Sequence, residues 1–464
     1  MNEFIKWRVV VSWGSRLPRL KPTQIFQCRA FLLSLTLYVE GMNAFGIADF
    51  LRVVRCAFAA GALVLAPLIG EVKAANAADW PHLHGPLHNN TMPEAGWKKD
   101  WPADGPPVLW KASVGRGLSS FAVVGERAYT AGNDGADEDS IICLDLNTGK
   151  ELWRHRYPCK TAAHEMPVVP FGPAATPTVE DGRVYMVSRE GDVWCLHAET
   201  GAVIWRKNML TDLKGKRPVY GYSSSVLVKE GRAYLDPGGD GQSTVCLDAK
   251  TGALLWGSGS GEAGYASPAL VDIAGTPALV MFKGDSLRIL NPADGKELAR
   301  HETVTRDFCN CATPHVQDSM IFISHTGSDG SSILKFADGK LTPVWNDRNL
   351  GMLFNSGVPW EGKLIVFNDQ KRGVKELRCL DTKTGQSVWV NDEIDKGTAI
   401  LSDGHLLILT SVGELVLAKP SPDRLEVLNR VQVLPAKTYV LPVLSHGRLL
   451  CKNNAGEVVC VDLR

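Results

Sequence analysis

The sequence predicts an all-β protein, an eight-bladed β-propeller of four-stranded antiparallel blades, closed by pairing of its N- and C-terminal strands. Three observations predict this fold. An eleven-residue phrase, "CLDLNTGKELW" at 143–153, returns at 195–205, 246–256 and 379–389. Positions equivalent to its first residue, here called anchors, recur every 37–52 residues, a spacing typical of one propeller blade per repeat. No convincing helical period follows residue 80.

Each repeat predicts four strands. In 174–205, the segments "TPTVED", "RVYMVS", "DVWCLHA" and "AVIW" alternate or run apolar, and Gly-containing turns separate them. The eight anchors are Cys143, Cys195, Cys246, Ile289, Ile333, Cys379, Val416 and Cys460. The propeller therefore occupies 106–464, preceded by a lead-in segment at 78–105.

The last repeat lacks its final strand, because Cys460 lies four residues from the end of the chain. The segment "PPVLWKASVG" at 106–115 supplies one, with Trp110 where the closing Trp of the phrase belongs. We expect these two segments to share a sheet, which closes the ring and removes two strand edges.

The residue types that recur in the phrase each have a structural role. Its Asp and Thr support a tight turn, and its Gly permits the positive φ that such a turn needs. Its Trp can fill the wedge between neighbouring sheets. The Trp residues that we assign to this docking role are Trp110, Trp153, Trp205, Trp256, Trp345 and Trp389.

These residues resemble the pyrroloquinoline-quinone (PQQ) repeat family. The family's Asp-x-x-Thr-Gly-x-x-x-Trp motif matches Asp145–Trp153, Asp248–Trp256 and Asp381–Trp389, and the resemblance covers 79–464. "DWPHLHGPLHNNT" at 79–91 is also similar to the lead-in of secreted members. The resemblance implies the propeller fold. It leaves the activity open, because the family includes both quinoprotein alcohol dehydrogenases and a scaffold of outer-membrane protein assembly.

The N-terminus indicates export. An apolar run at 56–69 follows Arg52 and Arg55, and Ala75-Asn76-Ala77 fits a small-x-small cleavage site. These features predict a signal peptide at 42–77, cleaved near Ala77, and a periplasmic or secreted protein without a transmembrane span in the mature chain. We interpret 1–41 as a non-native or disordered extension. A membrane anchor, or a separate export signal in the apolar run at 30–39, is the alternative.

Composition excludes some partners. The chain has 50 basic and 50 acidic residues, so nothing supports binding to nucleic acid. Eleven cysteines are present, of which Cys28 and Cys56 precede the cleavage site. Five of the other nine are anchors, where a small buried side chain is expected. An odd number leaves at least one thiol free or paired outside the chain.

The loops that lead into the first strand of each blade, here called the channel loops, rim one mouth of the central channel. They lie at 115–120, 161–177, 219–225, 262–268, 306–314, 351–357, 395–400 and 436–442. Such a funnel suits a planar or polar ligand, or a peptide. Its candidate residues are Arg116, His164, Tyr222, Tyr265, Asn310, Asn355, Lys396 and Tyr439. Alternatively, these side chains only satisfy backbone groups and bridge blades.

The resemblance to quinoprotein dehydrogenases implies a PQQ and calcium site, a catalytic Asp and usually a disulfide between adjacent cysteines. Here Cys309-Asn310-Cys311 is the nearest match, and both free thiols and a strained disulfide stay open. If the chain is such an enzyme, Arg116 or Lys396 contacts the quinone, and Asp307 or Glu165 is the base.

No metal site is expected. His82, His84 and His88 precede the first blade and have no fixed scaffold, and the acidic stretch at 133–140 predicts a solvated hairpin tip. We therefore expect no catalytic residue and no cofactor. The expected function is a monomeric binding or scaffold module for an envelope protein, peptide or polymer. The alternative is a PQQ-dependent dehydrogenase that oxidises an alcohol or sugar, and a carbohydrate-binding propeller is a weaker third possibility.

Overall fold

A computed structural model of the chain describes residues 79–464, except for 136, 160–171, 306–307, 328, 354 and 371–372. The expected extension at 1–41 and the signal peptide at 42–77 lie outside these residues. The described residues belong to one unit, Lys73–Arg464.

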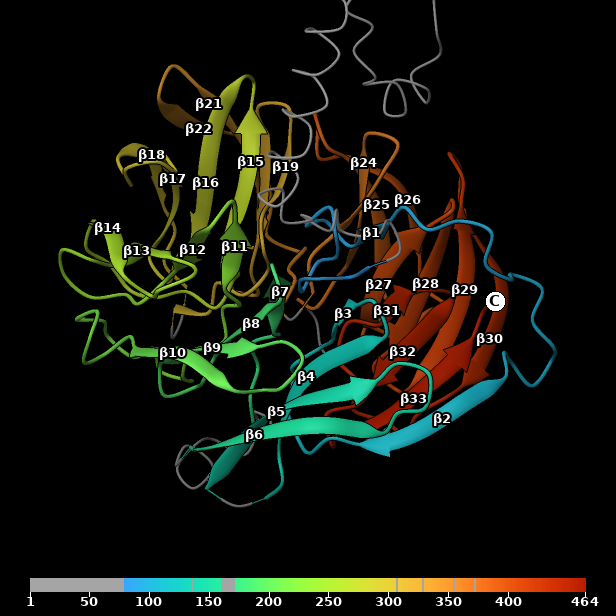
Figure 1. The fold of residues 1–464 in the computed structure, drawn as a ribbon. Coiled ribbons are helices and arrows are strands. Elements are labelled where there is room, and N and C mark those ends of the chain that lie inside the picture. The colour runs from blue at the N-terminus through green and yellow to red at the C-terminus, as the bar shows by residue number, and fades with distance from the viewer. Residues whose placement is uncertain are drawn as a thin grey trace, which may run out of the picture. The chain divides into compact units, whose positions relative to one another are not determined.

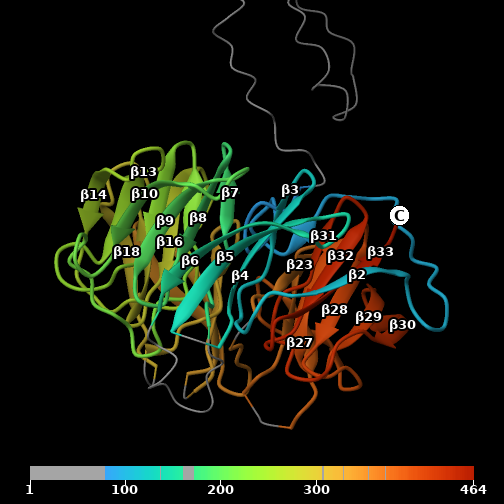
Figure 2. The same cartoon turned by 60° about the horizontal axis from the view of Figure 1, so that its bottom comes forward.

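Eight sheets form a ring, each with four antiparallel strands of which the first in sequence is the innermost in every blade but the last (Figures 1 and 2). The predicted eight-bladed propeller is confirmed. Blade 1 contains β3 (Ala122–Val124), β4 (Arg127–Asn133), β5 (Glu138–Asp145) and β6 (Glu151–Pro158); blade 2 contains β7 (Thr178–Glu180), β8 (Arg183–Val187), β9 (Asp192–His197) and β10 (Val203–Asn208). Blade 3 contains β11 (Leu227–Lys229), β12 (Arg232–Leu235), β13 (Thr244–Asp248) and β14 (Leu254–Ser258); blade 4 contains β15 (Ala269–Ile273), β16 (Thr276–Phe282), β17 (Ser286–Leu290) and β18 (Glu297–Glu302).

The second half of the ring continues the same order. Blade 5 contains β19 (His315–Gln317), β20 (Met320–Ser324), β21 (Ser331–Ala337) and β22 (Lys340–Asp347); blade 6 contains β23 (Val358–Trp360), β24 (Lys363–Phe367), β25 (Leu377–Asp381) and β26 (Ser387–Asn391). Blade 7 contains β27 (Gly397–Ser402), β28 (His405–Thr410), β29 (Glu414–Pro420) and β30 (Leu425–Gln432); blade 8 contains β31 (Val443–Ser445), β32 (Arg448–Lys452), β33 (Glu457–Asp462) and β2 (Val108–Ser113).

Blade 8 closes the ring as the sequence predicts. Its outermost strand, β2, comes from the N-terminal part of the chain and pairs antiparallel with β33 near the C-terminus. Trp110 lies opposite the last anchor, Cys460.

The anchors keep one register in every blade. Each anchor on the third strand lies opposite the closing position on the fourth strand, and a β-bulge follows between that pair and the turn. In blade 5, Trp345 comes two residues later than in the phrase, yet it still lies opposite the anchor Ile333 because the hairpin is longer. In blades 4 and 7 the closing position holds Ala299 and Arg430.

The closing Trp residues contact the next blade. The indole N–H of Trp153 donates to the carbonyl of Ala198 at 2.9 Å, and that of Trp205 donates to Ala249 at 3.0 Å. Equivalent bonds join Trp110 to Leu146, Trp256 to Pro292 and Trp389 to Ser421. A side chain at the phrase's glycine would collide with these rings, as Gly252 shows with Trp205. Gly252 also has a φ of +72°, so both backbone and packing require glycine there.

The lead-in segment enters the channel. Trp80 forms an antiparallel bridge with Val123 of blade 1, and the amide of Val179 in blade 2 donates to the carbonyl of Pro81. Residues Thr91–Met92 form β1, which pairs parallel with β27 and gives blade 7 a fifth, innermost strand. The expectation that this segment has no fixed scaffold is therefore wrong, because the inner strands of the blades offer unpaired backbone groups to it.

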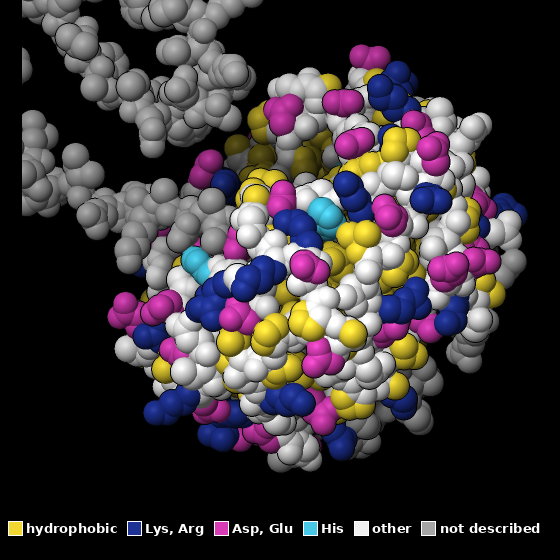
Figure 3. Space-filling model, turned by 90° about the vertical axis from the view of Figure 1, so that its right-hand side faces the viewer, with side chains coloured by type: hydrophobic (Ala, Val, Ile, Leu, Met, Phe, Trp, Pro, Cys, Tyr) yellow, Lys and Arg dark blue, Asp and Glu magenta, His cyan; other side chains and the backbone are white. Residues whose placement is uncertain are grey.

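The outer surface carries charges of both signs. Figure 3 shows the side with β30 and β2, where basic, acidic and hydrophobic side chains alternate. This mixture agrees with the formal net charge of zero. None of the described segments forms a helix with the length and hydrophobicity that crossing a membrane requires.

Candidate functional site

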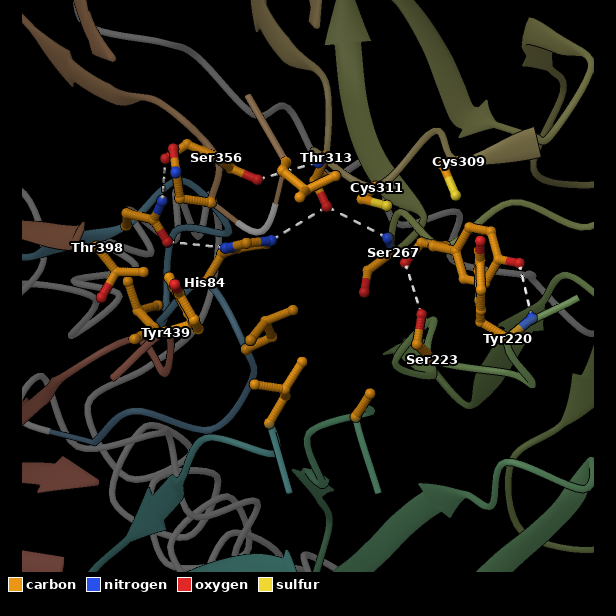
Figure 4. Close-up of a pocket in the computed structure, with 18 of the residues that line it drawn as sticks. His84, Tyr220, Ser223, Ser267, Cys309, Cys311, Thr313, Ser356, Thr398 and Tyr439 are labelled. Atoms are coloured by element: carbon orange, nitrogen blue, oxygen red, sulfur yellow. Dashed lines mark hydrogen bonds between the residues drawn. The ribbon is translucent and has the colours of Figure 1, made fainter. Parts of the chain in front are cut away.

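A cavity of about 300 Å³ lies in the channel, where the channel loops meet (Figure 4). Every blade contributes to its wall. The residues that line it are Leu118, Gly172, Ala174, Arg189, Tyr220, Ser223, Tyr265, Ser267, Cys309, Cys311, Thr313, Leu353, Asn355, Ser356, Thr398, Tyr439 and Leu441, with Leu83, His84 and Asn90 of the lead-in segment. The sequence thus brings eight separate loops to one site.

Hydroxyl groups connect the channel loops from blade to blade. The amide of Ser225 donates to the hydroxyl of Ser267 at 3.0 Å, and the amide of Ser267 donates to the hydroxyl of Thr313 at 3.2 Å. The same bond joins Ser120 to Thr176, Thr176 to Ser225, and Thr313 to Ser356. This chain of bonds, here called the hydroxyl ring, satisfies backbone N–H groups that the converging strands leave unpaired.

The lead-in segment takes part in the same network. The imidazole of His84 is bonded on one side to Oδ1 of Asn90 at 2.8 Å and on the other to the hydroxyl of Thr313 at 3.1 Å. Nδ2 of Asn90 donates to the carbonyl of Ser356 at 3.1 Å, and its own carbonyl accepts from the amide of Leu401 at 2.9 Å. The bonds of the hydroxyl ring run from blade 1 to blade 6, and Asn90 continues the connection from blade 6 to blade 7.

Burial keeps the channel histidines neutral. The pKa of His84 is lowered from 6.5 to about 4, because desolvation disfavours its charged form more than its bond to Asn90 supports it. Burial also lowers the pKa of His88 to about 4 and that of His82 well below 6.5, and Lys229 adds to both shifts. The rings of His82 and His88 lie 4.1 Å apart, which further disfavours a charge on either.

Three tyrosines add aromatic rings to the leucines of the wall. The rings of Tyr220 and Tyr265 are 6.0 Å apart, and the hydroxyl of Tyr265 accepts a bond from the amide of Tyr220 at 3.1 Å. Burial raises the pKa of Tyr265, so its hydroxyl stays protonated at neutral pH. Tyr439 is 37% exposed, which makes it the most accessible aromatic ring of the wall.

Three of the eight candidate residues line the cavity: Tyr265, Asn355 and Tyr439. Nδ2 of Asn355 donates to Asp369 at 3.1 Å. Its Oδ1 is buried and accepts no hydrogen bond among the described residues.

Two candidates are buried inside the blades instead. Tyr222 is 1% exposed, and its hydroxyl donates to the carbonyl of Pro237 at 2.8 Å. Asn310 is fully buried, and its Nδ2 donates to the carbonyls of Lys283, Gly284 and Thr303. Both satisfy backbone groups, which is the alternative that the sequence left open.

The remaining candidates lie elsewhere. The backbone of Arg116 bridges to Asn133, and Nζ of Lys396 lies 3.9 Å from a carboxylate oxygen of Asp369. Neither lines the cavity. His164 lies outside the described residues, as do Glu165 and Asp307.

Sequence reasoning missed the hydroxyl ring, although a signal for it exists. A Ser or Thr stands two residues before the first strand in blades 1 to 6, as Ser267 does before β15. Asn90 was missed and His84 was considered only as a metal ligand, because nothing in the sequence shows that the lead-in segment turns into the channel.

The described wall does not fit PQQ with calcium. It contains no carboxylate that could hold the ion, and its single cation is Arg189. The guanidinium of Arg189 donates to the carbonyls of Gly172 and Tyr220, so it is committed to the loops rather than free for the cofactor's carboxylates. Within the described ranges, no group of three or more His, Cys, Asp or Glu side chains is placed to hold a metal ion.

Comparisons with known proteins agree with this fold. Residues 137–391 match the family model of the outer membrane protein assembly factor BamB. BamB from Moraxella catarrhalis superposes with a TM-score of 0.56 at 11% identity, over 77% of this chain and 99% of that one. A quinohemoprotein alcohol dehydrogenase from Comamonas testosteroni superposes with a TM-score of 0.50 at 12% identity, over 84% of this chain and 81% of that one. The computationally designed protein Ika8 superposes with a TM-score of 0.51 at 13% identity, over 77% of this chain and 100% of that one. A search of curated proteins found no match.

Fold and repeats together define a β-propeller built from PQQ-like repeats. Because the family model covers more than half of the chain, the chain belongs to the family that this model describes, that of the outer membrane protein assembly factor BamB. The solved structures share less than 25% identity with the chain and show the fold alone.

Proposed function

We propose that this protein is a binding or scaffold propeller of the cell envelope that holds a peptide segment of a protein partner in the cavity between its channel loops. The observation that supports this proposal is the cavity itself. Its wall joins aromatic rings to hydroxyl and amide groups and contains no carboxylate among the described residues. Such a surface suits an uncharged, partly apolar group that can form a few hydrogen bonds.

The size of the cavity favours a side chain or short segment over a large ligand. About 300 Å³ is at the lower limit of small-molecule pockets, whereas a peptide can place one or two side chains there and rest on the rim. The lead-in segment forms part of the floor through His84 and Asn90. A ligand therefore enters and leaves by the mouth that the channel loops surround.

The family supports a protein partner. Its model is named for outer membrane protein assembly, a process of the cell envelope. Export through the signal peptide expected at 42–77 would bring the mature chain to that compartment. The partner belongs to the same compartment.

Filling the cavity tests the proposal. We would screen the purified chain against peptides from envelope proteins and measure the affinity of those that bind by calorimetry. Ser223→Trp should weaken binding more than tenfold, because Ser223 lines the cavity and a Trp there occupies its space. Val203→Trp is the matched control, because Val203 is 48% exposed on the outer strand of blade 2. Equal affinity of the two variants, or no binding peptide at all, would contradict the proposal.

The dehydrogenase alternative has its own test. We expect micromolar PQQ with Ca²⁺ to leave the absorption spectrum of the mixture equal to the sum of its parts, and no dye to be reduced when alcohols or sugars are added. The described wall offers no carboxylate for the ion. Saturable PQQ binding that Ser223→Trp abolishes would replace the scaffold proposal with an enzymatic one.

A further inference from the structure

Two of the cysteines differ from all the others that the structure describes. Cys309 and Cys311 are partly exposed and line the cavity, whereas the other seven described cysteines are buried in the blades. Figure 4 shows both sulfur atoms in the wall, with Cys311 next to Thr313. Accessible thiols react, and buried ones are usually inert.

The residue between them fixes their positions. Asn310 is fully buried and bonded to three carbonyls, and its own carbonyl accepts bonds from the amides of Tyr265 and Ala266, each at 3.0 Å. Because Asn310 turns into the blade, its two neighbours are held on the opposite, cavity side. Residues two positions apart lie at most about 7 Å apart at Cα, close to the range that a disulfide spans.

The two thiols also contact each other. A hydrogen bond between Cys309 and Cys311 raises the pKa of Cys311 well above its ordinary value, and burial adds to the shift. Cys311 therefore keeps its proton, which leaves the sulfur of Cys309 as the one to attack first.

We propose that Cys309 and Cys311 form a reversible dithiol–disulfide site in the cavity wall that exchanges with an external disulfide. The thiolate of Cys309 attacks one sulfur of that disulfide, and a mixed disulfide forms while the other half leaves as a thiol. The sulfur of Cys311 then loses its proton to solvent, attacks Cys309 and expels the second half. The protein loses two protons and two electrons, and the external disulfide takes them up to become two thiols. The proposal does not depend on the peptide-binding function.

Mass mapping of the full chain tests this site. The tryptic peptide 307–335 contains both cysteines and no other. After equilibration with oxidised glutathione and alkylation, we expect this peptide to have lost two hydrogens and to carry no alkyl group. Excess reduced glutathione should restore two alkylation sites. The anchors Cys143 and Cys195 should stay unmodified in the folded protein under both conditions, because they are fully buried.

A pair of single variants shows whether the two sulfurs act together. Cys311→Ser should trap one glutathione on Cys309, because no second thiol is present to expel it. Cys309→Ser should form the corresponding adduct on Cys311 more slowly, because burial still raises the pKa of that thiol when its partner is gone. Oxidised glutathione that leaves both thiols alkylatable, or that adds stably to both in the parent chain, would overturn the proposal.

Discussion

The outer turns of the blades and the channel loops use the same residue types for different purposes. Cys195 at an outer anchor is fully buried, and burial raises its pKa to about 12. Cys311 in a channel loop faces a cavity and a second thiol. Aromatic rings differ in the same way, since Trp205 wedges two blades together while Tyr265 faces the cavity.

This difference shows what the repetition in the sequence encodes. The outer turn recurs because every blade must solve the same packing problem, so its residues are interchangeable between blades. The channel loops converge on one site that has no internal symmetry, so each loop contributes a different group. Changes to the outer turns should therefore alter stability, and changes to the channel loops should alter binding, titration or reactivity.

The largest effect on stability is expected at the Trp residues that pack between neighbouring blades. Trp205→Ala should lower the free energy of unfolding by about 4 kcal/mol, because it removes a buried ring and a hydrogen bond to Ala249. Chemical denaturation measures this loss. Val203→Ala on the same strand is the control and should cost under about 0.5 kcal/mol, because Val203 is 48% exposed. Similar losses for the two variants would show that Trp205 has no special role.

A smaller and pH-dependent effect is expected in the channel. The pKa of His84 is about 4 in the folded protein, so its stabilising contribution is complete above pH 6.5 and disappears as the pH falls towards 4. Over that window the parent chain should lose about 2 kcal/mol more stability than His84→Gln, which cannot titrate. Denaturation midpoints between pH 4 and 7 measure the difference.

The smallest effect is expected at the turn of the phrase. Asp248 accepts bonds from the amides of Lys250 and Thr251 and from the hydroxyl of Thr251, and these bonds lower its pKa. Asp248→Ala should cost about 1 kcal/mol at pH 7, where the carboxylate is fully charged. Below its folded pKa the parent loses the same bonds, so the two proteins should converge in acid. Asp240→Ala, at an exposed position nearby, should leave the free energy of unfolding at pH 7 unchanged.

The sequence predicted the architecture well because that architecture is repeated. Seven whole repeats and one composite follow directly from the anchors, and Trp110 opposite Cys460 confirms the closure. Even the late Trp345 was assigned to the correct blade.

The site was predicted only in outline. The loops that surround it were identified, but whether a side chain faces the cavity or the blade depends on single φ and ψ angles within irregular loops. Tyr222 and Tyr265 occupy similar loop positions, and only Tyr265 lines the cavity. The lead-in segment has no repeat to compare with, so its path into the channel could not be derived from the sequence.

Closure through β2 and β33 has a consequence for how the protein acquires its structure. The two strands are separated by almost the whole propeller, so β2 stays without a partner until the last residues of the chain are available. Contacts this distant in sequence slow folding, because the intervening chain must be ordered first. The lead-in segment must already lie between the blades when the ring closes, since β1 pairs with β27 of blade 7. We therefore expect the blades to assemble around the N-terminal segment first. Pairing of β2 with β33 should be the last step, because it closes the ring.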